Sequence, residues 1–269
     1  MLEQVFARAR AAGRCTFIPY IVAGDPDIQT TELFLSALTQ AGADIIELGI
    51  PYGDPVADGP TIAAAGHRAL EAGVDLDGIF PVAERAASHG CAPILLFCYL
   101  NVILQYGLED FARASARAQV RGVIVPDVTF EESGELRTAL ASANIAMPLL
   151  VAPSTPAQRA GLIAERSSGF VYVVSRLGVT GAGFAPDTSA LASQLAQLRN
   201  MTDKPLAVGF GVSTPQHVSS VAPLADGVIV GSALIEAYDG KQGLEAVAAA
   251  SSLSASLIEA MAPRLTREC

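Results

Sequence analysis

Lysine and histidine are scarce in this sequence of 269 residues, which has three histidines and no tryptophan. Enzymes that form a Schiff base with their substrate need a buried lysine. Only Lys204 and Lys241 are available, and Lys204 comes just before an apolar run rather than after one. The histidines, His67, His89 and His217, lie far apart and lack the spacing of metal ligands. We therefore expect neither Schiff-base chemistry nor a metal site.

Positive charge is also in short supply, since 17 lysines and arginines face 27 aspartates and glutamates, giving a net charge of -10. A nucleic acid or an anionic membrane would need a basic surface, so neither is an expected partner. The most apolar stretch, Pro93–Leu104, is too short to span a bilayer, and the N-terminus lacks a secretory signal pattern. A reducing, cytoplasmic setting is expected from four cysteines without paired spacing, Cys15, Cys91, Cys98 and Cys269.

What the sequence does contain is a regular alternation of short apolar runs and helical stretches. Hydrophobic residues make up 51% of the chain and charged residues 16%, which predicts a large buried core. The runs predict eight strands, at Phe17–Val22, Ile45–Leu48, Ile94–Tyr99, Val123–Val125, Leu149–Val151, Phe170–Val174, Leu206–Val208 and Val228–Val230. Between them lie stretches of helical period such as Thr31–Gln40, Gly107–Gln119, Glu131–Ser142 and Thr188–Arg199.

Eight such units without a linker-like segment favour an α/β fold of the (β/α)8 TIM-barrel type over an open doubly wound sheet. We expect one domain over residues 1–269. An extra amphipathic helix is predicted at Met1–Ala12, where Leu2, Val5, Phe6 and Ala9 recur at helical spacing.

Residues 44–62, DIIELGIPYGDPVADGPTI, hold a cluster of carboxylates. Barrels carry their functional groups at the C-terminal ends of the strands and in the loops that follow. Glu47 lies near the end of the second predicted strand, and Asp54 and Asp58 follow in a proline-rich loop. Strand alternation puts Glu47 on the same face as Ile45, so both point into the barrel or neither does. The alternative is a carboxylate at a strand edge in water.

Three glycine-rich turns follow the last predicted strands: SRLGVTGAG at 175–183, GFGVSTPQ at 209–216 and GSALIE at 231–236. Backbone N–H groups in turns that open helices can bind an anion, aided by the helix dipole. Glycine also serves ordinary turns, but three such turns after consecutive strands favour a phosphate site. Thr180, Gly181 and Gly183 also make the first turn a candidate mobile lid.

The chemistry that remains is acid–base catalysis by carboxylates on a small phosphorylated substrate. No GxGxxG fingerprint follows the first strand, so a dinucleotide cofactor is not expected. Two carboxylates can divide roles if the buried one has a raised pKa and the wetter one stays ionised. We expect the raised pKa at Glu47 and the anion at Asp58.

Five motifs resemble the family of tryptophan synthase alpha subunits: FIPYIVAGDP at 17–26, ELGIPYGDPVADGPTI at 47–62, SRLGVTGA at 175–182, GFGVST at 209–214 and GSALIE at 231–236. The resemblance implies a (β/α)8 lyase that cleaves indole-3-glycerol phosphate to indole and glyceraldehyde 3-phosphate without a cofactor in this subunit. It implies that Glu47 protonates the indole ring carbon and helps to remove the glycerol hydroxyl proton. Asp58 would stabilise the charge that develops at the indole N–H.

The resemblance also implies a set of substrate contacts. Gly211, Gly231 and Ser232 would form the phosphate cradle, and Thr180 and Gly181 would belong to a loop that closes over the site. Other substrate-lining positions would be Tyr20, Ile62, Phe97, Tyr172 and Phe210. Taken alone, such aromatic residues are more often ordinary core.

The implied partner is a beta subunit that uses pyridoxal phosphate, receives indole through a tunnel and orders the loops of this subunit in an alpha-beta-beta-alpha complex. Pro51 and Asn101 match contact positions for that partner, and Asp54 would be a structural or interface-coupling residue. Thr129 stands where many family members have proline, and Gly53 where serine is common. Two alternatives therefore stay open: a stand-alone lyase, and a non-catalytic subunit that activates a partner.

Overall fold

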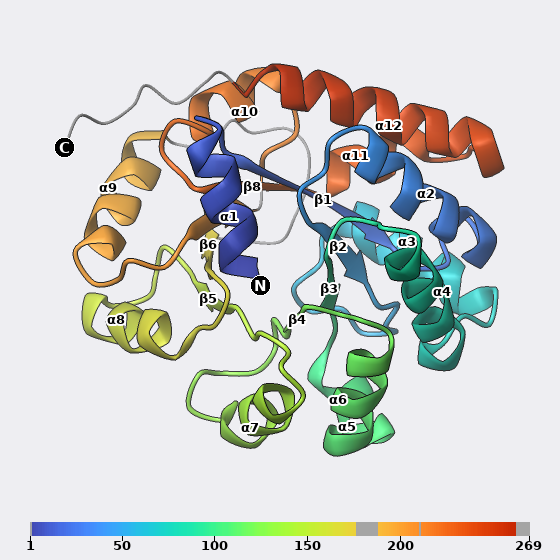
Figure 1. Cartoon of the computed structure of the whole chain (residues 1–269), viewed down its shortest axis with the longest axis horizontal. Coiled ribbons are helices and arrows are strands. Elements are labelled where there is room, and N and C mark those ends of the chain that lie inside the picture. The colour runs from blue at the N-terminus through green and yellow to red at the C-terminus, as the bar shows by residue number, and fades with distance from the viewer. Residues whose placement is uncertain (1, 176–187, 210, 262–269) are drawn as a thin grey trace.

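The computed structural model describes residues 2–175, 188–209 and 211–261, in which eight parallel strands form a barrel (Figure 1). The strands are β1 (Thr16–Val22), β2 (Ile46–Gly49), β3 (Ile94–Phe97), β4 (Gly122–Ile124), β5 (Leu149–Val151), β6 (Val171–Val174), β7 (Leu206–Gly209) and β8 (Gly227–Val230). Their order is β4-β3-β2-β1-β8-β7-β6-β5. The Val123 N–H donates to the Ala146 carbonyl (2.8 Å) just before β5, so the barrel is nearly closed.

Helices form the outer layer around these strands (Figure 1). In the described residues they are α1 (Leu2–Ala11), α2 (Ile28–Gln40), α3 (Pro60–Glu71), α4 (Leu76–Ser88), α5 (Leu100–Tyr106), α6 (Leu108–Arg117), α7 (Gly134–Ser142), α8 (Ala157–Arg166), α9 (Thr188–Arg199), α10 (Pro215–Val221), α11 (Ser232–Tyr238) and α12 (Gly243–Glu259). None of these helices combines the length and the apolar character that crossing a membrane requires.

Helix α1 is the extra N-terminal helix that the sequence predicts, and it packs at the N-terminal end of the barrel. Its buried face consists of Leu2, Val5, Phe6 and Ala9. A side chain on Gly227, the first residue of β8, would come within 2.9 Å of the Phe6 ring, so glycine allows this close approach. Phe6 also packs against Phe170, with ring centroids 5.4 Å apart. Functional groups are therefore to be sought at the opposite end of the strands.

All eight predicted strands are confirmed, with ends that differ by at most two residues. Strand β3 ends at Phe97 rather than at the predicted Tyr99. The Cys98 N–H still donates to the Ile124 carbonyl (2.9 Å), but the chain then turns into α5, and the Leu100 N–H donates to the Asp127 side chain (2.9 Å). Tyr99 is therefore held at the mouth of the barrel instead of within the ladder.

Two of the predicted helix starts differ from the observed ones by three residues, and each difference has a local cause. Helix α2 begins at Ile28 rather than Thr31, because the Asp27 side chain caps it by accepting the Thr30 N–H (2.7 Å). Helix α7 begins at Gly134 rather than Glu131, because the Ser133 N–H donates to the Thr129 carbonyl (3.0 Å) and closes a separate turn.

Helices α3 and α11 depart from simple strand–helix alternation, since each, like α5, comes between a strand and a further helix. Helix α3 begins at Pro60, two residues after Asp58, and α11 begins at Ser232, just beyond the end of β8. Both helices contact β1 and each other, and Figure 1 shows them on the same side of the barrel. The acidic loop and the last glycine-rich turn therefore lead into neighbouring helices.

Candidate active site

Glu47 is buried inside the C-terminal half of the barrel. In the strand register it lies between Tyr20 of β1 and Leu95 of β3, and its exposed fraction is 1%. Its Oε2 has no hydrogen-bond partner among the described residues. Burial, and secondarily the charge of Asp58, raise the pKa of Glu47 to about 8. Glu47 is therefore a buried carboxylate inside the barrel and not one at a strand edge in water.

Asp58 approaches Glu47 from the loop between β2 and α3. Its N–H donates to the Pro55 carbonyl (3.0 Å), a turn that brings the side chain back towards the barrel. Burial raises the pKa of Asp58 to about 6, while a hydrogen bond from the Tyr99 side chain lowers it. Near pH 7, these two pKa values leave Asp58 mostly ionised and Glu47 mostly protonated. The sequence did not predict that the pKa of Asp58 would be raised.

Tyr99 belongs to the site, although its only sequence signal is an aromatic residue at the end of a predicted strand. Its hydroxyl accepts the Ala57 N–H (3.2 Å) and hydrogen-bonds the Asp58 carboxylate. Its ring stacks on Tyr52, with centroids 5.0 Å apart and an interplanar angle of 24°. Tyr99 thus fixes both the backbone of the acidic loop and the side chain of Asp58.

Tyr20 and Phe97 form one aromatic wall beside Glu47. Their rings meet edge to face, with centroids 5.8 Å apart. A side chain on Gly49 would overlap the Tyr20 hydroxyl, so only glycine leaves room for the phenol at the end of β2. Both aromatic residues are nearly fully buried, and Tyr20 pairs with Glu47 in the strand register.

Tyr172 lies across the barrel from Glu47. It belongs to β6, and its phenol occupies the space that a side chain on Gly209 of β7 would fill. Burial raises its pKa well above the ordinary value, and the charges of Glu47 and Asp58 raise it further. Because β2 and β6 lie in opposite parts of the strand order, these side chains meet through the barrel interior.

The predicted phosphate cradle is described only in part. A side chain on Gly231 would lie 3.2 Å from the Tyr20 ring, which places this turn directly against the aromatic wall. Ser232, the next residue, opens α11 and is half-buried. Gly211 has φ +79°, a left-handed conformation that favours glycine. Three further predicted contacts, Thr180, Gly181 and Phe210, lie outside the described residues, as do residues 178–187 of the candidate lid, which the sequence predicts at 178–188.

The other predicted positions are spread over the loops at the same end. Ile62 is buried in α3, four residues after Asp58. Asp54 and Asn101 are exposed, whereas Pro51 is buried within this chain. The two departures from the family pattern are exposed as well: the Thr129 hydroxyl donates to Glu132 (2.8 Å), and a side chain on Gly53 would meet no atom within 4 Å. Neither departure contacts the buried carboxylates.

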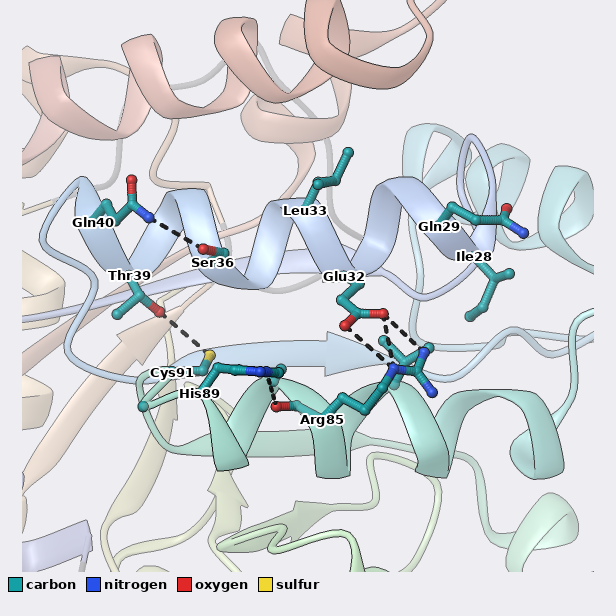
Figure 2. Close-up of a pocket in the computed structure, with 13 residues that line it drawn as sticks. Ile28, Gln29, Glu32, Leu33, Ser36, Thr39, Gln40, Arg85, His89 and Cys91 are labelled. Atoms are coloured by element: carbon teal, nitrogen blue, oxygen red, sulfur yellow. Dashed lines mark hydrogen bonds and ion pairs between the residues drawn. The ribbon is translucent and has the colours of Figure 1, made fainter.

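A hollow on the outer wall, between α2 and α4, contains a histidine and a cysteine but no catalytic arrangement (Figure 2). His89 Nδ1 lies 2.8 Å from the Arg85 carbonyl, and Arg85 also pairs with Glu32 (2.8 Å). The Cys91 thiol donates to the Leu35 carbonyl (3.4 Å), and burial raises its pKa, which makes it a poor nucleophile. These groups join two helices rather than form a second reaction centre.

Lys204 makes contacts that stabilise the fold and lie away from Glu47. The Lys204 ammonium donates to the carbonyls of Ala164 (2.8 Å), Glu165 (2.6 Å) and Ser167 (2.7 Å), and it precedes β7, at the end opposite Glu47. It therefore holds the end of α8. Across residues 2–175, 188–209 and 211–261, no three histidine, cysteine or acidic side chains group closely enough to hold a metal ion.

Comparison with known proteins agrees with this geometry over the whole barrel. The family model described as tryptophan synthase alpha chain matches residues 6–262. A tryptophan synthase alpha chain of a Picosynechococcus strain is 45% identical over 262 residues, covering 97% of this chain and 99% of the relative. The alpha chain of Arabidopsis thaliana is 44% identical over 249 residues, covering 91% and 90%.

Solved structures give the same result. A chain of Mycobacterium tuberculosis tryptophan synthase superimposes with a TM-score of 0.89 at 35% identity, covering 97% of both chains. The tryptophan synthase alpha chain of Legionella pneumophila subsp. pneumophila gives a TM-score of 0.85 at 33% identity, covering 96% of both. The similarity thus includes the strands, the added helices and the sequence that carries the acidic loop.

Proposed function

The chain belongs to the tryptophan synthase alpha chain family, and on that premise we propose that it cleaves indole-3-glycerol phosphate to indole and glyceraldehyde 3-phosphate. The observation that carries this proposal is the pair of carboxylates at the barrel mouth, with the pKa of Glu47 raised to about 8 and that of Asp58 to about 6. Acid–base groups work best when their pKa lies near the working pH.

Glu47 would act first as an acid. Its neutral carboxyl group gives a proton to the indole ring carbon that carries the glycerol chain, and positive charge develops at the ring nitrogen. Asp58, ionised near pH 7, would accept the indole N–H and stabilise that charge. Tyr99 holds Asp58 in place through its hydroxyl. The two carboxylates thus start in the protonation states that this step needs.

The same Glu47 would then act as a base. Its carboxylate takes the proton from the hydroxyl on the carbon attached to the ring, and that carbon becomes the aldehyde of glyceraldehyde 3-phosphate. The electron pair of the broken carbon–carbon bond returns to the indole ring and neutralises the nitrogen. Glu47 regains its proton, so the cycle consumes no acid or base and needs no cofactor in this chain.

The aromatic wall and the glycine turns would bind the two ends of the substrate. Tyr20, Phe97 and Tyr172 offer a dry surface for the indole, since each is less than 7% exposed. The N–H groups near Gly231 and Ser232, with Gly211 on the neighbouring turn, would bind the phosphate. Thr180, Gly181 and Phe210 would complete the site and its closing loop.

A beta subunit is the proposed partner, in an alpha-beta-beta-alpha complex of the cytoplasm. The relatives include chains of whole tryptophan synthase structures, which supports such an assembly. Asn101 and Asp54 are exposed beside the barrel mouth, so they would contact the partner, with Pro51 supporting the loop from inside. Pyridoxal phosphate would belong to the beta subunit, where it would convert the indole released here.

The test is to follow release of indole from indole-3-glycerol phosphate by the chain alone and with a beta chain. Because this chain has no tryptophan, indole emission can be read without background from the alpha chain. We expect slow turnover alone and faster turnover with the partner. Fast turnover alone would favour the stand-alone lyase, and no turnover in either condition would favour a non-catalytic activating subunit.

A further inference from the structure

The two added helices α3 and α11 begin at the two halves of the site. Asp58, two residues before α3, belongs to the acid–base half, and Ser232, the first residue of α11, belongs to the phosphate half. The helices contact each other and lie on the same side of the barrel (Figure 1). Any change in how they sit against each other would change the spacing between the two halves.

A buried carboxylate connects the far ends of these helices. Asp25 follows β1 and is 1% exposed. Arg68 of α3 binds it through both carboxylate oxygens, with Nε 2.8 Å from Oδ1 and Nη2 2.9 Å from Oδ2. The same guanidinium reaches Asp239, just after α11, at 3.4 Å. A bidentate pair of this kind fixes orientation as well as distance.

Two contacts from α11 complete the link. The buried phenol of Tyr238, the last residue of α11, lies near enough to Asp25 for that carboxylate to raise its pKa, in addition to the larger effect of burial. The Thr61 hydroxyl, near the start of α3, donates to Glu236 in the last turn of α11 (3.1 Å). The C-terminal end of α11 is thus held to both ends of α3, and Arg68 holds α3 to Asp25 beyond β1.

We propose that Arg68 and Asp25 are positioning residues that set the distance between Asp58 and the phosphate cradle. A fully buried carboxylate is costly for the fold unless it is paired, and apolar side chains could join these helices at less cost. The bidentate pair instead supplies a defined geometry, which catalysis on a two-ended substrate needs. The inference rests on the proposed function, since that function supplies the two ends.

Two ligands separate positioning from binding. Indole-3-propanol phosphate carries an indole and a phosphate on an uncleavable chain, so it must reach both halves, whereas glycerol 3-phosphate needs only the phosphate half. In Arg68→Met we expect about a 10-fold loss of affinity for the first ligand and less than about a 2-fold change for the second. Arg68→Lys, which keeps the charge but not the fork, should recover only part of the loss.

Arg85→Met is the matched control, because Arg85 also pairs with a carboxylate from an outer helix, away from the site. It should bind both ligands like the unmodified chain. Arg68→Met alone leaves the buried Asp25 carboxylate without its partner, which could prevent folding. The double variant Asp25→Asn with Arg68→Met removes both charges, so it can be tested if the single variant does not fold. Its affinities should show the same selective loss.

Equal losses for both ligands in the folded variants, or no loss for either, would overturn the positioning role. If the unmodified chain bound neither ligand, the proposed function would fail and this inference with it. Selective loss of the two-ended ligand in the presence of normal glycerol 3-phosphate binding supports the role of Arg68 and Asp25.

Discussion

The Asp58 carboxylate raises the pKa of Glu47, which burial has already raised, to about 8. Asp58 itself is held nearer to water and to the Tyr99 hydroxyl, and its pKa is raised only to about 6. The barrel thus keeps one carboxyl protonated and the other ionised between these two values. This division, rather than the presence of two acids, gives the site its chemistry.

The first prediction is a bell-shaped pH dependence of kcat/KM for indole release. Activity should rise with pH through about 6 as Asp58 ionises, and fall through about 8 as Glu47 loses the proton that it must donate. Initial rates between pH 5 and pH 9, the range about these pKa values, measure both limbs. A profile that keeps rising beyond pH 9 would show that a neutral Glu47 is not the acid.

The second prediction concerns stability. Because the pKa of Glu47 is higher in the folded chain than its ordinary value of 4.5, ionising it costs folding free energy as pH rises from about 4.5 to about 8. Glu47→Gln removes this cost. Its free energy of unfolding relative to the unmodified chain should grow by up to about 1.4 kcal/mol per pH unit across that window. Urea unfolding at several pH values measures it, and a pH-independent difference would contradict the raised pKa.

The third prediction concerns Tyr99. Tyr99→Phe removes the hydrogen bond that lowers the pKa of Asp58, so the acidic limb of the pH profile should move to higher pH. It also leaves the Ala57 N–H without its acceptor, which should cost about 1 kcal/mol of stability. Tyr52→Phe is the control, since Tyr52 stacks on Tyr99 and its hydroxyl accepts from the Asn101 side-chain amide (3.5 Å). An acidic limb that moved equally in both variants would refute the role of Tyr99.

The fourth prediction compares two glycines near the acidic loop. Gly49→Ala should destabilise the fold by about 1 to 3 kcal/mol and lower activity, because the new methyl group would overlap the Tyr20 hydroxyl. Gly53→Ala adds the same group where no atom lies within 4 Å, so it should be nearly neutral. Thermal unfolding and indole release report both effects. Similar behaviour of the two variants would mean that Tyr20 is not held by this close approach.

The fold could be predicted because barrel strands are buried on both faces and so form continuous apolar runs. Alternation along β2 tied the orientation of Glu47 to that of Ile45, and the structure shows that both side chains are buried. The strand ends were less accurate, since β3 gives way to α5 through a bond from the Leu100 N–H to Asp127, a residue distant in the sequence. Such a contact leaves no periodic signal.

The site was predictable only where a residue's type already implied chemistry. Carboxylates and glycine-rich turns met that condition, whereas Tyr20, Phe97 and Tyr172 needed the family resemblance, because aromatic residues in strands are usually core. Tyr99 was missed because its role depends on a hydrogen bond to a loop some forty residues earlier in the sequence. The rise in the pKa of Asp58 depends on burial, which likewise exists only in the folded chain.

The most direct test of the account is turnover of indole-3-glycerol phosphate by the unmodified chain, by Glu47→Gln and by Asp58→Asn, with a beta chain present. The unmodified chain should release indole and glyceraldehyde 3-phosphate in equal amounts. Each variant should fold and still bind glycerol 3-phosphate, yet lose about 10²-fold or more in kcat. Wild-type turnover by a folded Glu47→Gln variant would contradict the assignment of Glu47 as the group that moves the proton.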